Sequence, residues 1–512
     1  MSRGTRLVIS ALALGLPACA PLSAQAPSGT HGQAPAIPDR PEKLAFKPIR
    51  YEVPKAKDFR VKLKNGITAY VVPDPHGQPL VSFDIVLKAG RWLDAPGKEG
   101  TAQLLGTLLR IGGTEKTKAD DLDERLDMLA AQSSGNLTDA SGALTMNLLA
   151  KDAREGFGLL LEMLTQPAFQ QDKLDLAKKN LRQQLERRND DSTGIEQREL
   201  GFLLRGEGHF SNHLPTAASL DAITRDDLKA LHGRLLSPEN LIVTVAGRFD
   251  RGDMVKLLNE TLGALKAGPA AKAAGKPPAA PYVAKPGIYV VDKAVNQGRV
   301  TLNLGLQGLR PTDADFAAVS VMNHVLGGGG FTSRFVKKIR SDEGLAYSAG
   351  TRAAAAQFPG DSGTFTALFQ TKTRTVAYGL RLALAELEKM RKDGVTDEEL
   401  KVAKGSLIEG FPARFPSKAA LAGAFASNDW TGIPDAYLET YQARIQVVTR
   451  EDVLRAAQKY LRPDQVAILA VGNAKEMEEG DVKDHPGALS EVAKLPLVKL
   501  PLRDPLTLKP MK

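Results

Sequence analysis

Two residues seven positions apart, Arg340 and Tyr347, are the pair in this sequence whose types and spacing best suit a chemical role. A guanidinium stays charged at any relevant pH and offers a fork of hydrogen-bond donors, while a phenol offers a neutral O–H donor. Together they can bind a peptide carbonyl or the oxyanion that develops from it. The plain alternative is that Arg340 is a solvated helix residue and Tyr347 is a core aromatic at the start of a strand.

Four consecutive glycines, Gly327, Gly328, Gly329 and Gly330, precede this pair. They end an apolar helical pattern and leave a backbone without Cβ atoms, which can adopt positive φ or lie close to another chain. We therefore expect a glycine-rich loop here. It would be followed by a short helix that is capped by Thr332 and carries Arg340, and then by a strand that begins near Tyr347.

The whole stretch, NHVLGGGGFTSRFVKKIRSDEGLAYS at positions 323–348, resembles the second half of the pitrilysin/insulinase family of zinc peptidases. In that family a glycine-rich loop precedes an Arg-x6-Tyr pair, the pair reaches across an internal chamber towards the substrate, and zinc lies in the opposite half. The resemblance implies that Arg340 and Tyr347 contact substrate and that Gly327 to Gly330 form a substrate-binding loop. The glycine run, the spacing and the flanking GLAYS together favour this over the plain alternative.

The zinc motif of that family, His-x-x-Glu-His on a helix, corresponds here to GTAQLLGTLLRIGGT at positions 100–114. Gln103 stands at the first histidine position, Gly106 at the glutamate base and Thr107 at the second histidine, and the third ligand falls at Gln184. Two imidazoles one helical turn apart and a distant carboxylate can hold zinc. Because an amide, a glycine and a hydroxyl are poor substitutes, we expect no metal in this chain and a helix that serves the core.

Other candidates for a metal or a nucleophile are weak. Glu186 lies two residues past the third-ligand position, which turns it about 200° around a helix. Among seven histidines only His209 and His213 have helical ligand spacing, and their Gly/Ser/Asn/Pro surroundings favour a loop. We expect His324 to support the glycine loop or the core. The sequence has no Gly-x-Ser-x-Gly, and the glycine run lacks the Lys-Ser/Thr ending of a phosphate-binding loop.

The elements that position these residues are expected to form an α+β protein with two homologous repeats, each a mainly antiparallel sheet covered by helices. The first repeat, 51–265, opens with the hairpin FRVKLKNGITAYVV, in which Asn65-Gly66 favours a type I′ turn. Its sequence patterns predict helices at 100–112, 119–132, 152–166 and 172–190 and strands at 143–150 and 240–247.

The second repeat, 287–475, copies part of the first. ITRDDLKALHGRLLSPENLIVTVAG, at 223–247, aligns without a gap with VTREDVLRAAQKYLRPDQVAILAVG, at 448–472. Each predicts a Thr-capped helix that ends before Pro and a buried strand that ends in Gly. An Ala/Pro-rich linker, 266–286, joins the repeats, and 476–512 is expected to be a tail that is extended or packed on the surface.

The N-terminus predicts export. In residues 1–26, Arg3 and Arg6 precede an apolar run that is too short to span a bilayer, as in a secretory signal. The only cysteine, Cys19, follows this run, and two alternatives stay open: lipid attachment at an imperfect lipobox, or cleavage near Ala24. Residues 27–50 predict a disordered tether. We expect the periplasm or cell envelope of a bacterium, with membrane anchoring if Cys19 is lipidated.

The distribution of charged residues indicates which classes of partner to expect. The formal net charge is +9, but lysines and arginines alternate with acids as on solvated helix faces, so we expect no nucleic acid. Two functions stay open. The chain could be the non-zinc subunit of an exported peptidase, in which a homologous zinc-bearing partner cleaves peptide substrates. It could instead be a structural or scaffolding protein without a role in proteolysis.

Overall fold

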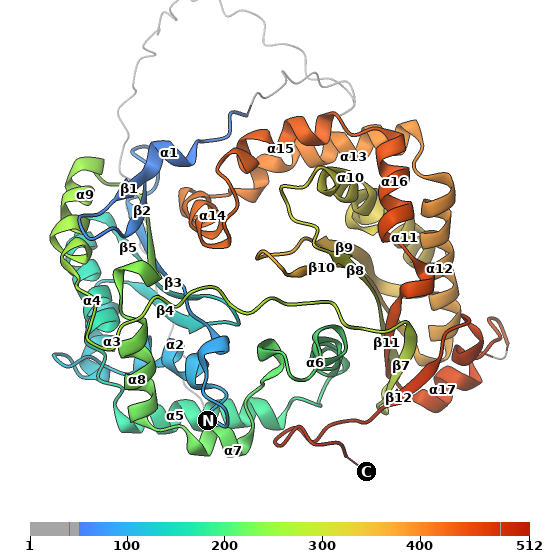
Figure 1. Ribbon diagram of the computed structural model, residues 1–512, viewed down its shortest axis with the longest axis horizontal. Helices are drawn as coiled ribbons and strands as arrows, with labels where there is room; N and C mark the ends of the chain where they lie inside the picture. Colours follow the sequence, from blue (N-terminus) through green and yellow to red (C-terminus); the bar gives the residue numbers. More distant parts are fainter. Residues whose placement is uncertain (1–39, 41–50, 482, 512) are drawn as a thin grey trace, which may run out of the picture. The chain divides into compact units, whose positions relative to one another are not determined.

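The computed structural model describes residues 40, 51–481 and 483–511. The predicted signal sequence with Cys19, and the predicted tether apart from residue 40, lie outside the described residues. Residues 53–512 form one compact unit around two six-stranded sheets (Figure 1). No helix in the described part of the chain is long and apolar enough to cross a membrane.

The first sheet has the strand order β1-β2-β6-β3-β5-β4, and only β2 and β6 run parallel. Its strands are β1 (Arg60–Lys62), β2 (Thr68–Pro73), β3 (Leu80–Leu87), β4 (Gln132–Leu137), β5 (Gly142–Leu149) and β6 (Leu241–Gly247). The helices of this repeat are α1 (Ala56–Phe59), α2 (Thr101–Ile111), α3 (Ala119–Met128), α4 (Ala153–Thr165), α5 (Gln171–Glu186), α6 (Ser192–Arg205), α7 (Ala217–Ala222), α8 (Arg225–Leu235) and α9 (Arg251–Glu260). Alternate residues of β3 and β5 are buried, because one face of the sheet packs on the helical core.

The second sheet has the order β12-β7-β11-β8-β10-β9, so its five strands from β7 to β9 repeat the order of the five from β2 to β4. Its strands are β7 (Gly287–Asp292), β8 (Gln297–Gln307), β9 (Ala346–Ala354), β10 (Ser362–Lys372), β11 (Ala467–Gly472) and β12 (Leu497–Leu500). The helices are α10 (Ala314–Asn323), α11 (Arg334–Val336), α12 (Val376–Asp393), α13 (Asp397–Glu409), α14 (Lys418–Thr431), α15 (Ala436–Gln446), α16 (Arg450–Tyr460) and α17 (Ala474–Glu479).

Helices α8 and α16 show how closely the repeats correspond. Thr224 and Thr449 each begin their helix with a reciprocal capping box. The next residues also have equivalent roles: Arg225 Nε donates to the Ala168 carbonyl at 3.0 Å, and Arg450 Nε donates to the Val395 carbonyl at 2.9 Å. The predicted α+β fold of two homologous repeats is confirmed.

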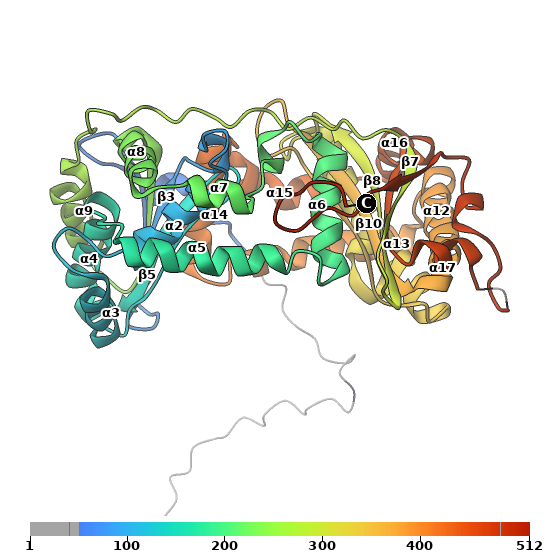
Figure 2. The same cartoon turned by 90° about the horizontal axis from the view of Figure 1, so that it is seen from below.

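One helix of each repeat also packs against the sheet of the other repeat. Ile195 of α6 packs in a buried cluster with Val291 of β7 and with Leu469 and Val471 of β11. In return α14 contacts β2 and β6, and the Phe425 ring lies 5.6 Å from the Tyr70 ring. Figure 1 and Figure 2 both show α6 beside the second sheet and α14 beside the first. This exchange makes the two repeats a single packed body.

Two local predictions were wrong. Gly66 has φ +89 but Asn65 is not among the residues with positive φ, and the Gly66 N–H donates to the Leu63 carbonyl, so the hairpin turn is not type I′. The predicted helix ends were wrong as well. The helix predicted to reach 132 ends at Met128, where Ala130 adopts φ +47 and the chain turns into strand β4, and the helix predicted to reach 190 ends at Glu186.

The C-terminal tail does more than lie on the surface. It adds β12 to the second sheet, parallel to β7, and then reaches the first repeat. Arg503 forms an ion pair with the buried Glu199 at 3.2 Å, and the Ala217 N–H donates to the Leu506 carbonyl at 2.9 Å. Prolines 496 and 501 flank β12 without interrupting it, so the strand is compatible with a proline-rich tail.

Candidate functional site

Arg340 and Tyr347 lie against each other. Arg340 belongs to a π-helical turn, Lys337–Asp342, and Tyr347 is the second residue of β9. The Arg340 guanidinium carbon lies 4.5 Å from the centroid of the Tyr347 ring and 4.5 Å from that of Phe331. The guanidinium is therefore held between two aromatic rings. We call Phe331, Arg340 and Tyr347 the arginine stack.

A β-bulge explains why Tyr347 points outwards. Ala346 pairs with Thr371 and Ser348 pairs with Gln370, which leaves Tyr347 as the extra residue on the edge strand β9. A bulge of this kind turns a side chain away from the ladder. Tyr347 is 86% exposed, so it is not the core aromatic of the plain alternative.

Arg340 keeps its hydrogen-bond donors available. No carboxylate in the described part of the chain forms an ion pair with it, and its recorded contacts are the two rings of the stack. Such cation–π contacts are worth about 0.5–1 kcal/mol at exposed sites. Sequence analysis missed Phe331, which is 67% exposed; the signal was an aromatic residue directly after the glycine run.

Two ion pairs hold the segment that carries the arginine stack. Arg334 of α11 binds Glu399 of α13 through two hydrogen bonds of 2.6 Å each. Burial would raise the pKa of Glu399, but hydrogen bonds and charge from Arg334, together with the capping Thr396, lower it to about 2. Lys338 and Glu343 pair at 2.7 Å across the π-helical turn. The arginine stack thus rests on an anchored segment.

The glycine run is not an open loop, contrary to expectation. His324–Gly328 continues α10 as a π-helical turn, and Gly330–Thr332 forms a 3-10 turn. A Cβ atom on Gly327 would lie 2.6 Å from the Thr351 nitrogen, so this glycine permits close approach to β9 of the same chain. Gly330 has φ +68, which allows the chain to reverse before α11.

Contrary to the prediction, Thr332 does not cap the helix. Ser333 occupies the capping position without a side-chain cap, and the Thr332 hydroxyl donates to the Gly329 carbonyl at 3.2 Å. The half-buried His324 lies beside Gly329, where a Cβ atom would approach its ring to 2.8 Å. Burial lowers the pKa of His324, which is consistent with the predicted supporting role.

Helix α2 carries Gln103, Gly106 and Thr107, while Gln184 is exposed on α5. A Cβ atom on Gly106 would lie 2.4 Å from the Leu137 nitrogen in β4, so the backbone of that strand fills the place of any larger side chain. The Thr107 hydroxyl donates to the Gln103 carbonyl at 3.1 Å. An amide, a hydroxyl and a blocked glycine position do not fit zinc.

The start of α2 depends on a carboxylate that sequence analysis missed. Asp94 accepts hydrogen bonds from the Gly100 N–H at 2.9 Å and from the Ala102 N–H at 2.7 Å. Burial raises the pKa of Asp94 to about 6, although these two hydrogen bonds act in the opposite direction. Its role in holding the helix is structural.

The histidine pair lies in a loop as predicted. His209 precedes a 3-10 turn, Phe210–Asn212, and its Nδ1 lies 2.8 Å from the Ser211 hydroxyl, while His213 is exposed. Burial, and then the charge of Arg205, lower the pKa of His209. Within the described residues, no group of three or more His, Cys, Asp or Glu side chains could hold a metal ion.

Two neighbouring cavities were not predicted. Gln103 and Thr107 line one of about 590 Å³, and a second of about 520 Å³ shares Asp139, Ala140 and Gln357 with it. Residues from both repeats line each cavity. Arg340 and Tyr347 line neither of these two cavities.

Sequence comparisons match both repeats to one family. A profile described as "Insulinase (Peptidase family M16)" matches residues 70–200, and one described as "Peptidase M16 inactive domain" matches residues 222–407. The chain is 24% identical over 413 residues to an uncharacterized zinc protease of Streptomyces coelicolor, covering 79% of this chain and 87% of the relative. It is 25% identical over 413 residues to the non-peptidase homolog YmxG of Helicobacter pylori, covering 79% and 92%.

Solved structures agree on the fold. A peptidase M16 inactive domain from Pseudomonas fluorescens superposes with a TM-score of 0.71 at 24% identity, over 81% of this chain and 97% of the other. The periplasmic protease PqqL from Escherichia coli superposes with a TM-score of 0.69 at 15% identity, over 85% and 50%. At these identities the likeness concerns the fold alone.

Proposed function

Because this chain belongs to the M16 (insulinase) peptidase family, we propose that it is a non-zinc subunit that binds and orients peptide substrate for a homologous, zinc-bearing partner chain. The observation that carries the proposal is a contrast within the chain. The positions that hold zinc and base in the family are Gln103, Gly106 and Thr107, whereas Arg340 and Tyr347 are present, adjacent and accessible.

Absence of peptidase activity in the isolated chain has independent support. Residues 222–407 match an inactive-domain profile, and one relative is named a non-peptidase homolog. We expect purified chain to contain no stoichiometric zinc and to leave unfolded peptides intact. Elemental analysis that finds about one tightly held zinc per chain would contradict this expectation.

In the proposed complex, Arg340 and Tyr347 donate hydrogen bonds to a peptide carbonyl close to the scissile bond. The exposed glycines of the segment, Gly328 and Gly330, contact the substrate backbone, and the partner's metal site supplies the hydrolytic chemistry. We also propose export to the periplasm or cell envelope, with repeats bounded at 51–265 and 287–475. The likeness to a periplasmic protease is consistent with export.

Gentle extraction from the native envelope, followed by size-exclusion chromatography and metal analysis, tests the proposal. We expect this chain to elute with a similar-sized subunit that carries zinc and an intact His-x-x-Glu-His, and the mixture to cleave peptides. A scaffolding role predicts assembly without any change in peptide cleavage. Recovery of a partner-free monomer would count against both the complex and the substrate-orienting role.

A further inference from the structure

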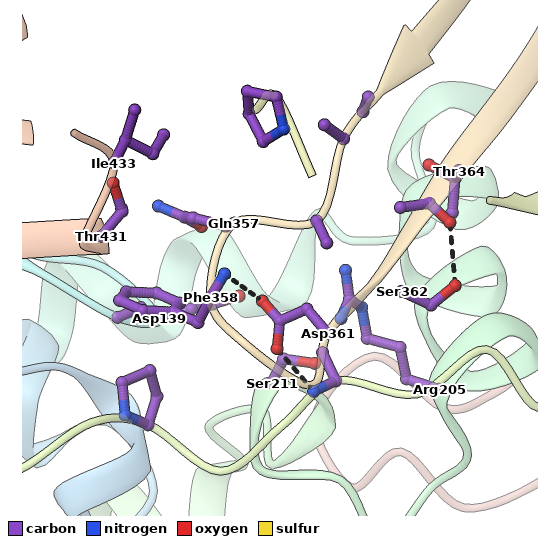
Figure 3. Close-up of a pocket in the computed structure, with 18 of the residues that line it drawn as sticks. Asp139, Arg205, Ser211, Gln357, Phe358, Asp361, Ser362, Thr364, Thr431 and Ile433 are labelled. Atoms are coloured by element: carbon purple, nitrogen blue, oxygen red, sulfur yellow. Dashed lines mark hydrogen bonds between the residues drawn. The ribbon is translucent and has the colours of Figure 1, made fainter. Parts of the chain in front are cut away.

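The second cavity, of about 520 Å³, has the size of a ligand pocket. Its walls come from the turn between β4 and β5, from α6 and the 3-10 turn after it, from the linker, and from β9, β10 and the turn between them (Figure 3). Sequence analysis assigned it no role, and it is distinct from the arginine stack. Its charges and its walls indicate what it binds.

The two acids that line the cavity are already engaged. Asp361 accepts a hydrogen bond from the Ala280 N–H at 2.8 Å and another from the Phe358 N–H at 2.9 Å, which fastens the linker to the β9–β10 turn (Figure 3). Asp139 forms an ion pair with Arg91 at 3.3 Å. These contacts fix both carboxylates in place, and neither acid pairs with an arginine that lines the cavity.

Two arginines in the same cavity have no such partners. Arg205, at the end of α6, and Arg352, in β9, line the cavity, and neither forms an ion pair or a side-chain hydrogen bond with any described residue. His209 also lines the cavity, and burial, followed by the charge of Arg205, lowers its pKa. The cavity therefore holds two guanidinium groups whose donors have no partner among the described residues.

The rest of the wall mixes polar and apolar side chains. Its apolar part includes these aromatic and proline side chains: Phe210, Phe316, Phe358, Tyr437, Pro277 and Pro311. A guanidinium binds a carboxylate through two parallel hydrogen bonds. The arginines suit an anionic group of a ligand, and the aromatic and proline side chains suit an apolar group next to that anion.

We infer that this cavity binds the carboxylate of a peptide, with Arg205 and Arg352 contacting the carboxylate oxygens and the aromatic wall contacting a neighbouring apolar side chain. The carboxylate can be the C-terminus of the peptide or an acidic side chain. The inference goes beyond the proposed subunit role and does not need a zinc-bearing partner, since both repeats of this chain build the cavity.

Calorimetric titration of the full chain, without a partner, tests the inference. The probes are acetyl-Ala-Ala-Phe with a free carboxylate, the same peptide as its C-terminal amide, and the amide of acetyl-Ala-Asp-Phe. We expect the free acid to bind about tenfold or more tightly than its amide, because hydrogen bonds to charged groups are each worth about 1.5–3 kcal/mol. Tight binding by the Asp-containing amide would identify an acidic side chain as an accepted source of the carboxylate, and weak binding would identify the C-terminus.

Variants locate the site. Arg205→Gln and Arg352→Gln should each weaken binding of the free acid by about tenfold. The control Arg248→Gln removes an exposed arginine that lines no described cavity and should bind as the parent does. If the parental chain binds the free acid and the amide with equal affinity, this result alone would overturn the inference. Parental affinity in both cavity variants, with unchanged melting temperatures, would overturn it as well.

Discussion

Helix α2 in the first repeat and the π-helical turn that continues α10 in the second each bring a glycine against an edge strand. A Cβ atom on Gly135 of β4 would lie 2.3 Å from the Gly106 carbonyl oxygen, and one on Gly350 of β9 would lie 3.4 Å from the Gly327 carbonyl oxygen. In both repeats a glycine on the helix faces a glycine on the strand, so the packing of this contact is common to both repeats.

The two helices differ in how they continue. Helix α2 remains regular to Ile111 and presents an amide and a hydroxyl at the positions where the family has zinc ligands. Helix α10 changes to a π-helical turn at His324, reverses at Gly330 and leads into the segment that carries the arginine stack. The two helices therefore pack on their edge strands in a similar way, but α2 presents no catalytic side chain, whereas the segment after α10 presents the accessible Arg340.

The largest effect is expected from returning a glutamate to the first repeat. Gly106→Glu places a charged side chain against the backbone of β4, where even a Cβ atom would lie 2.4 Å from the Leu137 nitrogen. We expect a loss of stability on the order of 4 kcal/mol or more in urea unfolding. Adding Gln103→His, Thr107→His and Gln184→Glu should not yield a zinc-binding chain, and stoichiometric zinc in a folded quadruple variant would contradict the account of α2.

Smaller substitutions compare the two repeats directly. Gly106→Ala and Gly327→Ala should each cost about 1–3 kcal/mol in the free energy of unfolding, because each new methyl group meets the backbone of the edge strand. The control Gly233→Ala, in α8 with open space around it, should stabilise the chain by about 0.5–1 kcal/mol. A neutral result for only one of the first two variants would show that the contacts are not equivalent.

The ion pair between Arg334 and Glu399 in the second repeat predicts that the free energy of unfolding depends on pH. Because the folded-state pKa of Glu399 is lowered to about 2, its contribution to stability is present above the ordinary value near 4.5 and is lost as the pH falls from 4.5 towards 2. Glu399→Gln should remove this slope and cost about 1–2 kcal/mol at neutral pH. The neighbouring Glu398→Gln, an exposed control, should keep the parental profile of unfolding free energy against pH.

Local patterns predicted the fold where neighbours in sequence decide it. The capping threonines, the helices α8 and α16 and the strands that follow them depend on residues a few positions apart, and the structure confirms them. The exchange of α6 and α14 between the sheets was not predictable in this way. It depends on contacts such as Phe425 with Tyr70, between segments far apart in the sequence.

In the candidate site, too, the sequence predicted features that depend on neighbouring residues and missed those that depend on tertiary contacts. The spacing of Arg340 and Tyr347 pointed to the pair, but the bulge that turns Tyr347 outwards depends on pairing with β10. Glycine composition favoured a loop, whereas packing against Thr351 holds Gly327 in a helical turn. The cavity between the repeats was missed because the residues that line it, such as Arg205 and Arg352, come from segments far apart in the sequence.

The smallest effect is expected at Phe331. Phe331→Leu removes one ring of the arginine stack and about 0.5–1 kcal/mol of cation–π interaction, so kcat/KM of the assembled complex should fall about two- to fivefold. Phe331→Tyr keeps a ring and should retain the parental rate. A larger loss in Phe331→Tyr than in Phe331→Leu would show that the ring does not act on Arg340.

The central claim is tested most directly by turnover of the assembled complex with Arg340→Ala or Tyr347→Phe in this chain. Each variant removes a hydrogen-bond donor while leaving α2 and the repeat contacts intact. The account predicts normal assembly and a fall in kcat/KM of roughly 10²- to 10³-fold, about 2–4 kcal/mol of transition-state stabilisation. Normal assembly with peptide cleavage at the parental rate in both variants would contradict it and would favour the scaffolding role.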